Sequence, residues 1–460
     1  MSRGGCNIGA ARMERVCVFE WRYGSEEMRR LFLVEHIVKR YVDVEVAVMQ
    51  GLEEAGLVPR GCAEVLRKCA EGVKPEEVYE REAVTGHDIA SLAYILGERC
   101  GECGRFVHLG VTSYDVVDTA WALILRDALT ILKRRLWRVI EMLIEYAEKY
   151  RDTVMAGRTH GQHAIPITLG FKFANYVYEL SRGLERLCEA EKRVVRSKIS
   201  GAVGTMAAWS GKGLVVEAVA SRVLGLEPHA ISTQVAPRDG FAELVTDLAI
   251  LASQLDRFAL EIRELSRTEI GEVYEAGKRI GSSTMPQKKN PVTAERISGL
   301  AKVVRAFTIT ALENIPLMHE RDLTNSSSER VLIPHVLLAA DQMLLDMEKL
   351  LRVLHVDEKA MERNLQLTKG TIMAEAVMVK LVEKGVPRHE AHKLLSELSA
   401  MVSNGEDFYT ILVKNEIVKK FLTPDELVKL LNPGSYLGNY KELIDRAVNY
   451  AKSVKALCVT

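Results

Sequence analysis

The densest set of chemically useful side chains lies between Gly281 and Pro291, in the sequence GSSTMPQKKNP. Glycine frees the backbone and the two prolines prevent a helix from running through the stretch, so a loop is expected between helical segments. This loop carries hydroxyl, ammonium and carboxamide groups, which could supply a base and cationic contacts to an anionic substrate. For a Lys-Lys pair alone, a solvated basic loop is the simpler interpretation.

A second set contains two histidines, in the sequence GRTHGQH from Gly157 to His163. Histidine can transfer protons near neutral pH, although a single histidine is more often structural. His160 and His163 could also form a metal pair, but no nearby carboxylate completes such a site. In the sequence HLGVTSYD (108–115), Ser, Thr and Asp are typical helix N-caps, and a helix N-terminus can also bind an anion.

Long helices must position these groups, because apolar residues recur at helical spacing over most of the chain and strand-like alternation is scarce. The sequence from Val116 to Lys149 predicts one helix of about nine turns, apolar on more than half of its circumference. Such a wide apolar face predicts burial against several neighbours, including other subunits. Four further stretches show the same pattern: Leu169–Lys198, Phe241–Ser266, Thr293–Ile315 and Val331–Leu354.

The expected fold is therefore all-α, with three helical domains. A smaller N-terminal helical domain spans residues 1–110, and a central long-helix bundle spans residues 111–365. A C-terminal helical domain with more turn residues spans residues 366–460.

The charge balance limits the classes of partner. Lysine plus arginine and aspartate plus glutamate each number 62, so no global field attracts nucleic acid or an anionic membrane. No apolar run approaches the ~20 residues of a membrane-spanning helix, and residues 1–10 lack the apolar core of a signal peptide. We therefore expect a soluble, cytoplasmic protein whose anionic partners are small molecules. Met1 and Met13 are both candidate start residues.

Cysteine usage argues against a disulfide scaffold. The chain has eight cysteines in 460 residues, and the CxxC of Cys100 and Cys103 has no second pair at zinc spacing. Buried thiols are the expected state. Asparagine and glutamine together number only 18, which is typical of a thermophilic source. Intracellular disulfides occur in such organisms, so an oxidised Cys100–Cys103 pair or another pairing stays open.

The whole string from Gly281 to Pro291 resembles the signature of the fumarase/aspartase superfamily, whose members release fumarate from succinyl compounds. The resemblance runs from about Trp21 to Ala451. It implies β-elimination of fumarate from adenylosuccinate, giving AMP, and from succinyl-aminoimidazole carboxamide ribotide in purine biosynthesis. Three further stretches are similar to the adenylosuccinate lyase family in particular: WRYGS (21–25), TGHD (85–88) and HERDLTNSSSER (319–330).

The resemblance also implies roles for individual residues. Ser282 would be the base, and Lys288 would stabilise the dianion that develops on the substrate. His160, supported by Glu295 and assisted by His87, would protonate the leaving nitrogen. No metal ion or redox cofactor is implied. The implied substrate-binding residues are Arg22, Tyr23, His87, Asp88, Thr112, Ser113, Gln234, Lys288, Asn290, Arg321, Ser326 and Arg330.

Two alternative functions remain open. Gln287 is typical of argininosuccinate lyases, but the Arg22-Tyr23 pair and the segment 321–330 are not expected in that sibling family. A non-catalytic helical scaffold would have no need of the base, the acid and the dianion-binding residues together. The resemblance further implies a homotetramer with sites shared between subunits, which agrees with the broad apolar face of Val116–Lys149.

Overall fold

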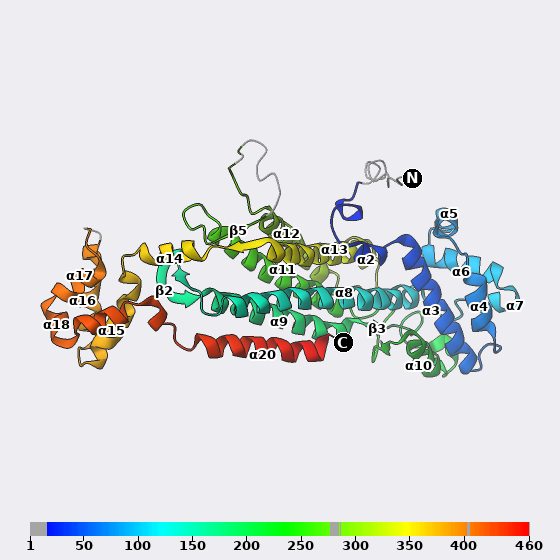
Figure 1. Cartoon of the computed structure of the whole chain (residues 1–460). Coiled ribbons are helices and arrows are strands. Elements are labelled where there is room, and N and C mark those ends of the chain that lie inside the picture. Colours follow the sequence, from blue (N-terminus) through cyan, green and yellow to red (C-terminus); the bar gives the residue numbers. More distant parts are fainter. Residues whose placement is uncertain (1–15, 277–284, 286, 403–404, 460) are drawn as a thin grey trace.

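The computed structural model describes residues 16–276, 285, 287–402 and 405–459 of the chain (Figure 1). Helices dominate these ranges, so the prediction of an all-α fold is confirmed. Three small two-stranded sheets are the exceptions in the described ranges. The predicted base, Ser282, lies outside the described residues, as do Met1 and Met13.

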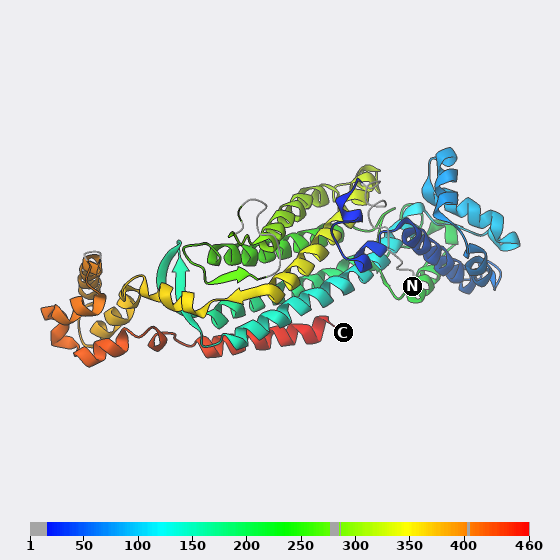
Figure 2. The ribbon, with the colours of Figure 1, turned by 45° about the horizontal axis from the view of Figure 1, so that its top comes forward.

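A bundle of long helices forms the middle of the molecule (Figures 1 and 2). The helices are α8 (Ser113–Lys149), α9 (Leu169–Val194), α11 (Asp239–Leu265), α12 (Val292–Glu313) and α13 (Thr324–Val353). Each of these helices begins and ends within a few residues of its predicted range, with one exception. Helix α13 begins seven residues before the predicted Val331 and contains Pro334.

The wide apolar face of α8 is buried largely within the chain itself. Leu129, Leu132 and Leu136 have no exposed surface, and α8 packs against both α9 and α13. Each fully buried leucine stabilises the fold by roughly 1.5–3 kcal/mol. The bundle core therefore fixes where each end of α8 lies, and those ends carry the motifs of interest.

The N-terminal helices gather at one end of the bundle, next to the start of α8 (Figure 1). Helix α10 joins them and lies so close to α3 that a Cβ at Gly51 would be 2.6 Å from the Val216 carbonyl oxygen. The helices are α2 (Glu26–Arg30), α3 (Val34–Glu54), α4 (Cys62–Ala70), α5 (Pro75–Thr85), α6 (Asp88–Arg99), α7 (Gly101–Gly104) and α10 (Gly213–Leu224).

The C-terminal helices gather at the opposite end, except that α20 returns along the bundle beside α9 (Figures 1 and 2). The helices are α14 (Glu358–Gln366), α15 (Ala374–Glu383), α16 (Arg388–Met401), α17 (Phe408–Lys414), α18 (Glu416–Phe421), α19 (Pro424–Leu430) and α20 (Tyr440–Cys458). Helix α10 belongs to the predicted central domain but packs with the N-terminal helices, and α20 belongs to the predicted C-terminal domain but packs along the central bundle. The hydrophobic cores are therefore not confined to the three predicted residue ranges. The division into domains stays a proposal.

The strands are short and serve as connections. β1 (Val154–Thr159) and β2 (Gln162–Thr168) form an antiparallel hairpin after α8. β5 (Val273–Glu275) pairs with β6 (Leu354–Val356) in antiparallel fashion, and β3 (Arg196–Ser197) pairs with β4 (Glu227–Pro228) in parallel.

Three disulfides correct the expectation of buried thiols. Cys100 and Cys103 are oxidised, but each pairs with α4 rather than with the other. The third bond joins α9 to the end of α20 across 270 residues of sequence. Spacing in the sequence could not reveal these partners, because the helices that bring them together are distant along the chain. The bonds are Cys62–Cys103, Cys69–Cys100 and Cys188–Cys458.

Loss of the bond between Cys188 and Cys458 is expected to lower thermal stability. A cross-link that closes so long a loop restricts the unfolded chain strongly, by roughly 5–6 kcal/mol in the loop-entropy model. We expect Cys458→Ser to lower the melting temperature measured by calorimetry without reductant. Cys17→Ser is the matched control, since Cys17 is the free cysteine of the described ranges. Equal melting temperatures for the two variants would contradict the prediction.

None of the helices in the described ranges combines the length and apolar content that crossing a bilayer requires. Within the same ranges, no three His, Cys, Asp or Glu side chains lie together as a metal site would need.

Candidate active site

Three helix N-termini converge on one cleft of about 530 Å³, here called the α8 cleft. Helices α6, α8 and α13 all begin there, and their first turns carry unpaired backbone N–H groups and the positive ends of the helix dipoles. Such ends attract anions. The structure brings six of the predicted site residues together at this cleft: His87, Asp88, Ser113, Arg321, Ser326 and Arg330.

His87, Asp88 and Arg330 form one side of the cleft. His87 caps α6 by accepting the Ala90 N–H at Nδ1 (3.4 Å), which leaves Nε2 to carry the proton of a neutral ring. Arg330 donates from Nη2 to Oδ2 of Asp88 at 3.3 Å, yet its side chain remains 64% exposed. An incoming anion could therefore reach the guanidinium.

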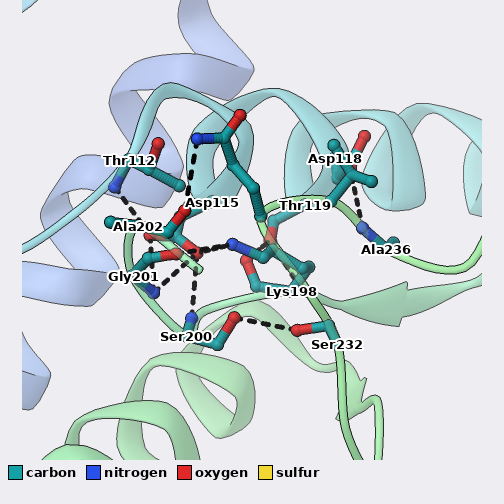
Figure 3. Close-up of polar contacts among 12 residues, drawn as sticks. Thr112, Asp115, Asp118, Thr119, Lys198, Ser200, Gly201, Ala202, Ser232 and Ala236 are labelled. Carbon is teal, nitrogen blue, oxygen red and sulfur yellow. Dashed lines mark hydrogen bonds and ion pairs between the residues drawn. The ribbon is translucent and has the colours of Figure 1, made fainter. Parts of the chain in front are cut away.

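A buried network holds the start of α8 in place (Figure 3). The Asp115 carboxylate accepts the Thr112 N–H at 2.8 Å, so Thr112 acts here as a helix cap. The same carboxylate accepts from Lys198 Nζ (2.6 Å) and from the Ser200 N–H (2.9 Å). Both side chains of the Asp115–Lys198 pair have no exposed surface. Burial lowers the pKa of Lys198, and the neighbouring Asp115 opposes that shift.

The network continues from Ser200 to the arginine of the cleft. Ser200 and Ser232 share a hydroxyl hydrogen bond of 2.8 Å (Figure 3). Gln234, which follows shortly after, donates to the Ala202 carbonyl oxygen (3.2 Å) and accepts from Arg321 Nη1 (3.1 Å). Both ends of the Gln234 amide are thus engaged by the protein, although the sequence predicts a substrate contact for this residue.

A buried charge cluster beneath the cleft escaped the sequence analysis. Asp118 pairs with Arg238, and Arg238 Nε lies 3.6 Å from Oε1 of Glu329. Glu329 lines the cleft, is 4% exposed and accepts a hydrogen bond from Asn325 at 3.0 Å. Burial raises the pKa of Glu329 to about 7, although Arg238 opposes the shift. No local pattern signals this cluster, because its members lie on three separate segments.

The raised pKa of Glu329 predicts a pH dependence of stability. The folded state binds this proton more tightly than the unfolded state, whose pKa is near 4.5. The resulting stabilisation is fully present below pH 4.5 and is lost as the pH rises through about 7. We expect Glu329→Gln to flatten the fall in the free energy of unfolding between about pH 4.5 and pH 7, a fall of up to ~3 kcal/mol that is followed through the melting temperature. The exposed Glu320→Gln serves as control, and identical pH profiles for both variants would refute the assignment.

His160 lies at the tip of the β1–β2 hairpin, outside the α8 cleft. His160 and Gly161 form the two-residue turn between Thr159 and Gln162, with φ of 53° and 74°. Two positive φ angles are typical of the tight turns that match strand twist, but histidine adopts them rarely. The imidazole is exposed at the tip, where it can meet a partner molecule.

A buried ion pair anchors the hairpin. Arg158 donates from Nη2 and Nη1 to the two carboxylate oxygens of Glu272, at 2.7 and 2.9 Å. Glu272 has no exposed surface and also accepts from Asn364 Nδ2 at 2.8 Å. This bidentate pair fixes the residue two positions before His160, so the tip has a defined orientation.

Lys288, Asn290 and Glu295 lie around the start of α12. Glu275 caps this helix, since its Oε1 accepts the Thr293 N–H at 2.9 Å. Glu295 is exposed in the first turn. In the described ranges no hydrogen bond or ion pair joins Glu295 to His160, so the predicted pairing is not formed within one chain.

Arg22 and Tyr23 line a separate hollow of about 410 Å³ with Arg296 of α12. The guanidinium of Arg22 lies 5.8 Å from the centre of the Tyr23 ring. Arg296 is held by Asp346, with a 2.6 Å hydrogen bond from Nε. This pair is not part of the α8 cleft.

Apart from Arg22 and Tyr23, the predicted site residues that the structure describes fall into three groups that lie apart in one chain. The α8 cleft lies at the first turn of α8, and the His160 hairpin follows its last turn. A helix of 37 residues is about 55 Å long. Figures 1 and 2 show the hairpin and the α6 end at opposite ends of the bundle. The α12 group, with Lys288, Asn290 and Glu295, is the third.

Comparison with protein families gives two matches. Residues 23–306 match the family model described as "Lyase", and residues 370–447 match the one described as "Adenylosuccinate lyase C-terminus". The chain is 45% identical to the adenylosuccinate lyase of Pyrococcus abyssi over 95% of this chain and 98% of the relative. It is 39% identical to the adenylosuccinate lyase of Aquifex aeolicus over 91% of this chain and 96% of the relative.

Solved structures with the same fold include enzymes of more than one activity. A fumarate lyase from Mesorhizobium sp. BNC1 superposes with a TM-score of 0.86, 32% identity and coverage of 93% of this chain and 98% of that one. A 3-carboxy-cis,cis-muconate lactonizing enzyme from Pseudomonas putida also reaches 0.86, with 31% identity and coverage of 95% and 99%. The fold alone therefore does not select the reaction.

Proposed function

Because the chain belongs to the adenylosuccinate lyase family and is a carbon–nitrogen lyase, we propose that its α8 cleft binds the nucleotide part of adenylosuccinate. The enzyme releases fumarate from that substrate, and from succinyl-aminoimidazole carboxamide ribotide. The observation that carries the proposal is the meeting of three helix N-termini with Arg321 and Arg330 in one cleft of about 530 Å³. A substrate with a phosphate and two carboxylates suits such a site.

The reaction removes one proton from carbon and breaks one C–N bond. We propose that Ser282 takes the proton next to the succinyl carboxylate and that Lys288 and Asn290 stabilise the resulting dianion. His160, with Glu295 as its partner, gives a proton to the departing nitrogen. His87 assists from the α8 cleft, where its Nδ1 is engaged by the Ala90 N–H and its Nε2 takes no part in that cap. The proposal calls on no metal ion or redox cofactor, since the elimination transfers no electrons to an acceptor.

Each complete site draws on several subunits of a homotetramer. The distance of about 55 Å along α8 supports this, because His160 cannot reach the α8 cleft of its own chain. Exposed apolar side chains on α11 and α12, including Leu260, Ile309 and Leu312, supply a surface for other subunits. In such an assembly His160 of one chain would meet Glu295 of another.

Setting and source are also part of the proposal. We place the enzyme in the cytoplasm of a thermophilic organism. The low count of 18 asparagine and glutamine residues and the three disulfides support a thermophilic source.

The function is tested by following fumarate release from adenylosuccinate and from its dephosphorylated analogue. Arg330→Ala is expected to raise KM for adenylosuccinate by roughly tenfold to a hundredfold, since a bidentate arginine contact is worth up to ~3 kcal/mol. For the analogue without the 5′-phosphate, the same substitution should raise KM far less. Arg22→Ala is expected to behave in the same way, because the resemblance to the family assigns Arg22 to the phosphate as well.

The control is Arg99→Ala, which removes an arginine from the far end of α6 and should leave KM for both substrates unchanged. If Arg330→Ala raises KM equally for both substrates, the phosphate assignment is refuted. Absence of fumarate release by the unmodified enzyme would refute the proposed function itself.

A further inference from the structure

We propose that Tyr114 is a positioning residue that sets the plane of the Arg321 guanidinium and so pre-forms a two-pronged anion contact in the α8 cleft. The inference rests on the proposed function and deepens it. Tyr114 carries no charge, but by holding Arg321 it would increase the affinity for the anionic group of the substrate. Tyr114 occupies the first turn of α8 and is 7% exposed.

The contact between the two side chains is a stacking one. Cζ of Arg321 lies 3.7 Å from the centre of the Tyr114 ring, which is the closest arginine–ring approach in the described ranges. A guanidinium at this distance over an aromatic face is held by its attraction to the ring and by dispersion. The ring also lies 5.9 Å from Cζ of Arg238. Tyr114 thus contacts Arg321, a predicted substrate-binding residue, directly.

Gln234 supplies the second restraint. It accepts from Nη1 of Arg321 at 3.1 Å and is itself tied to the Ala202 carbonyl oxygen at 3.2 Å. Stacking fixes the plane of the guanidinium, and the hydrogen bond fixes its rotation within that plane. Together the two contacts leave Arg321 little freedom.

The remaining donors of Arg321 form the fork. Nε and Nη2 are buried and have no hydrogen-bond partner in the described part of the chain. These two N–H groups point from the same edge of a guanidinium, which is the edge that binds a carboxylate or phosphate through two parallel hydrogen bonds. Leaving two buried donors unpaired is unfavourable without a ligand, so an oxyanion is the partner that this arrangement fits.

Pre-formation should act on binding rather than on the chemical step. A ligand that meets an immobilised fork does not have to order a flexible arginine. Removing the aromatic face should therefore raise KM for adenylosuccinate and weaken AMP binding, while kcat changes little. A residue that served the core alone would show no such division.

The test is a double-mutant cycle between Tyr114 and Arg321. Tyr114→Leu keeps apolar bulk but loses the aromatic face, and we expect about a tenfold rise in KM and in the AMP dissociation constant. In an Arg321→Ala background the same change should have about a twofold effect or less, since the group it positions is absent. Tyr114→Phe keeps the face and should stay within about threefold of the unmodified enzyme.

Two further measurements keep the test decisive. Gln234→Leu removes the other restraint and should also raise KM severalfold. This variant takes the place of Tyr114→Leu in the test if Tyr114→Leu does not fold. AMP binding by calorimetry needs no turnover, so it tests the positioning role even if the enzyme proves inactive on adenylosuccinate. Equal effects of Tyr114→Leu in both backgrounds, or a Tyr114→Phe loss as large as that of Tyr114→Leu, would overturn the proposal.

Discussion

Replacing Ser282 with alanine is expected to abolish turnover of adenylosuccinate and to leave AMP binding nearly unchanged. The hydroxyl acts on the proton that is transferred, so its loss should reduce kcat by ~10²–10⁴-fold or more. Fumarate release in the steady state measures the rate, and calorimetry with AMP measures binding.

The neighbouring Ser283→Ala provides a matched comparison, because it removes the same hydroxyl from the next position of the same segment. Near-normal activity of Ser282→Ala would show that Ser282 is not the base. If Ser283→Ala is the inactive variant instead, the assignment belongs to the adjacent residue.

Mixing two inactive enzymes should restore activity. His160→Ala subunits and Ser282→Ala subunits, exchanged in equal amounts, should give hybrid tetramers in which about a quarter of the sites hold both intact residues. The physical reason is the length of α8, since about 55 Å separates the two ends of this 37-residue helix. His160, beyond one end, must serve a cleft that another chain provides.

The control is a pair of variants from the same group. Arg321→Ala and Arg330→Ala both alter the α8 cleft of one chain, so no hybrid site contains both arginines and no rescue is expected. Native mass spectrometry should confirm that subunits exchange. Exchange without any rescue in the first mixture would rule out sites that take His160 and Ser282 from different subunits.

Local patterns were sufficient for the fold class and for the positions of the five long helices of the bundle. The repeat of apolar residues from Val116 to Lys149 predicted α8 within three residues at its start and at the observed residue at its end. Such a prediction succeeds because helix formation depends on neighbours three and four positions apart. The motifs around Gly281–Pro291 and 319–330 likewise identified the family, which full-length relatives now show.

Local patterns could not identify residues that contact each other but are distant in the sequence. The disulfides join cysteines up to 270 positions apart, whereas the sequence left open whether Cys100 and Cys103 pair with each other or with other cysteines. The amide of Gln234 holds Arg321, which no local pattern indicated, and its predicted contact with substrate stays a prediction. In both cases the side chain's chemistry was evident and its partner was not.

The sequence by itself determined which groups could do chemistry: a hydroxyl near lysines, a histidine between glycines, and arginines near a helix start. Tertiary structure alone decided their environment. Packing of α13 against α8 stacks Arg321 on Tyr114, and burial beside Asp118 raises the pKa of Glu329 to about 7. Desolvation and contact geometry depend on everything within a few ångströms in space, whereas residue type and spacing describe only what is near along the chain.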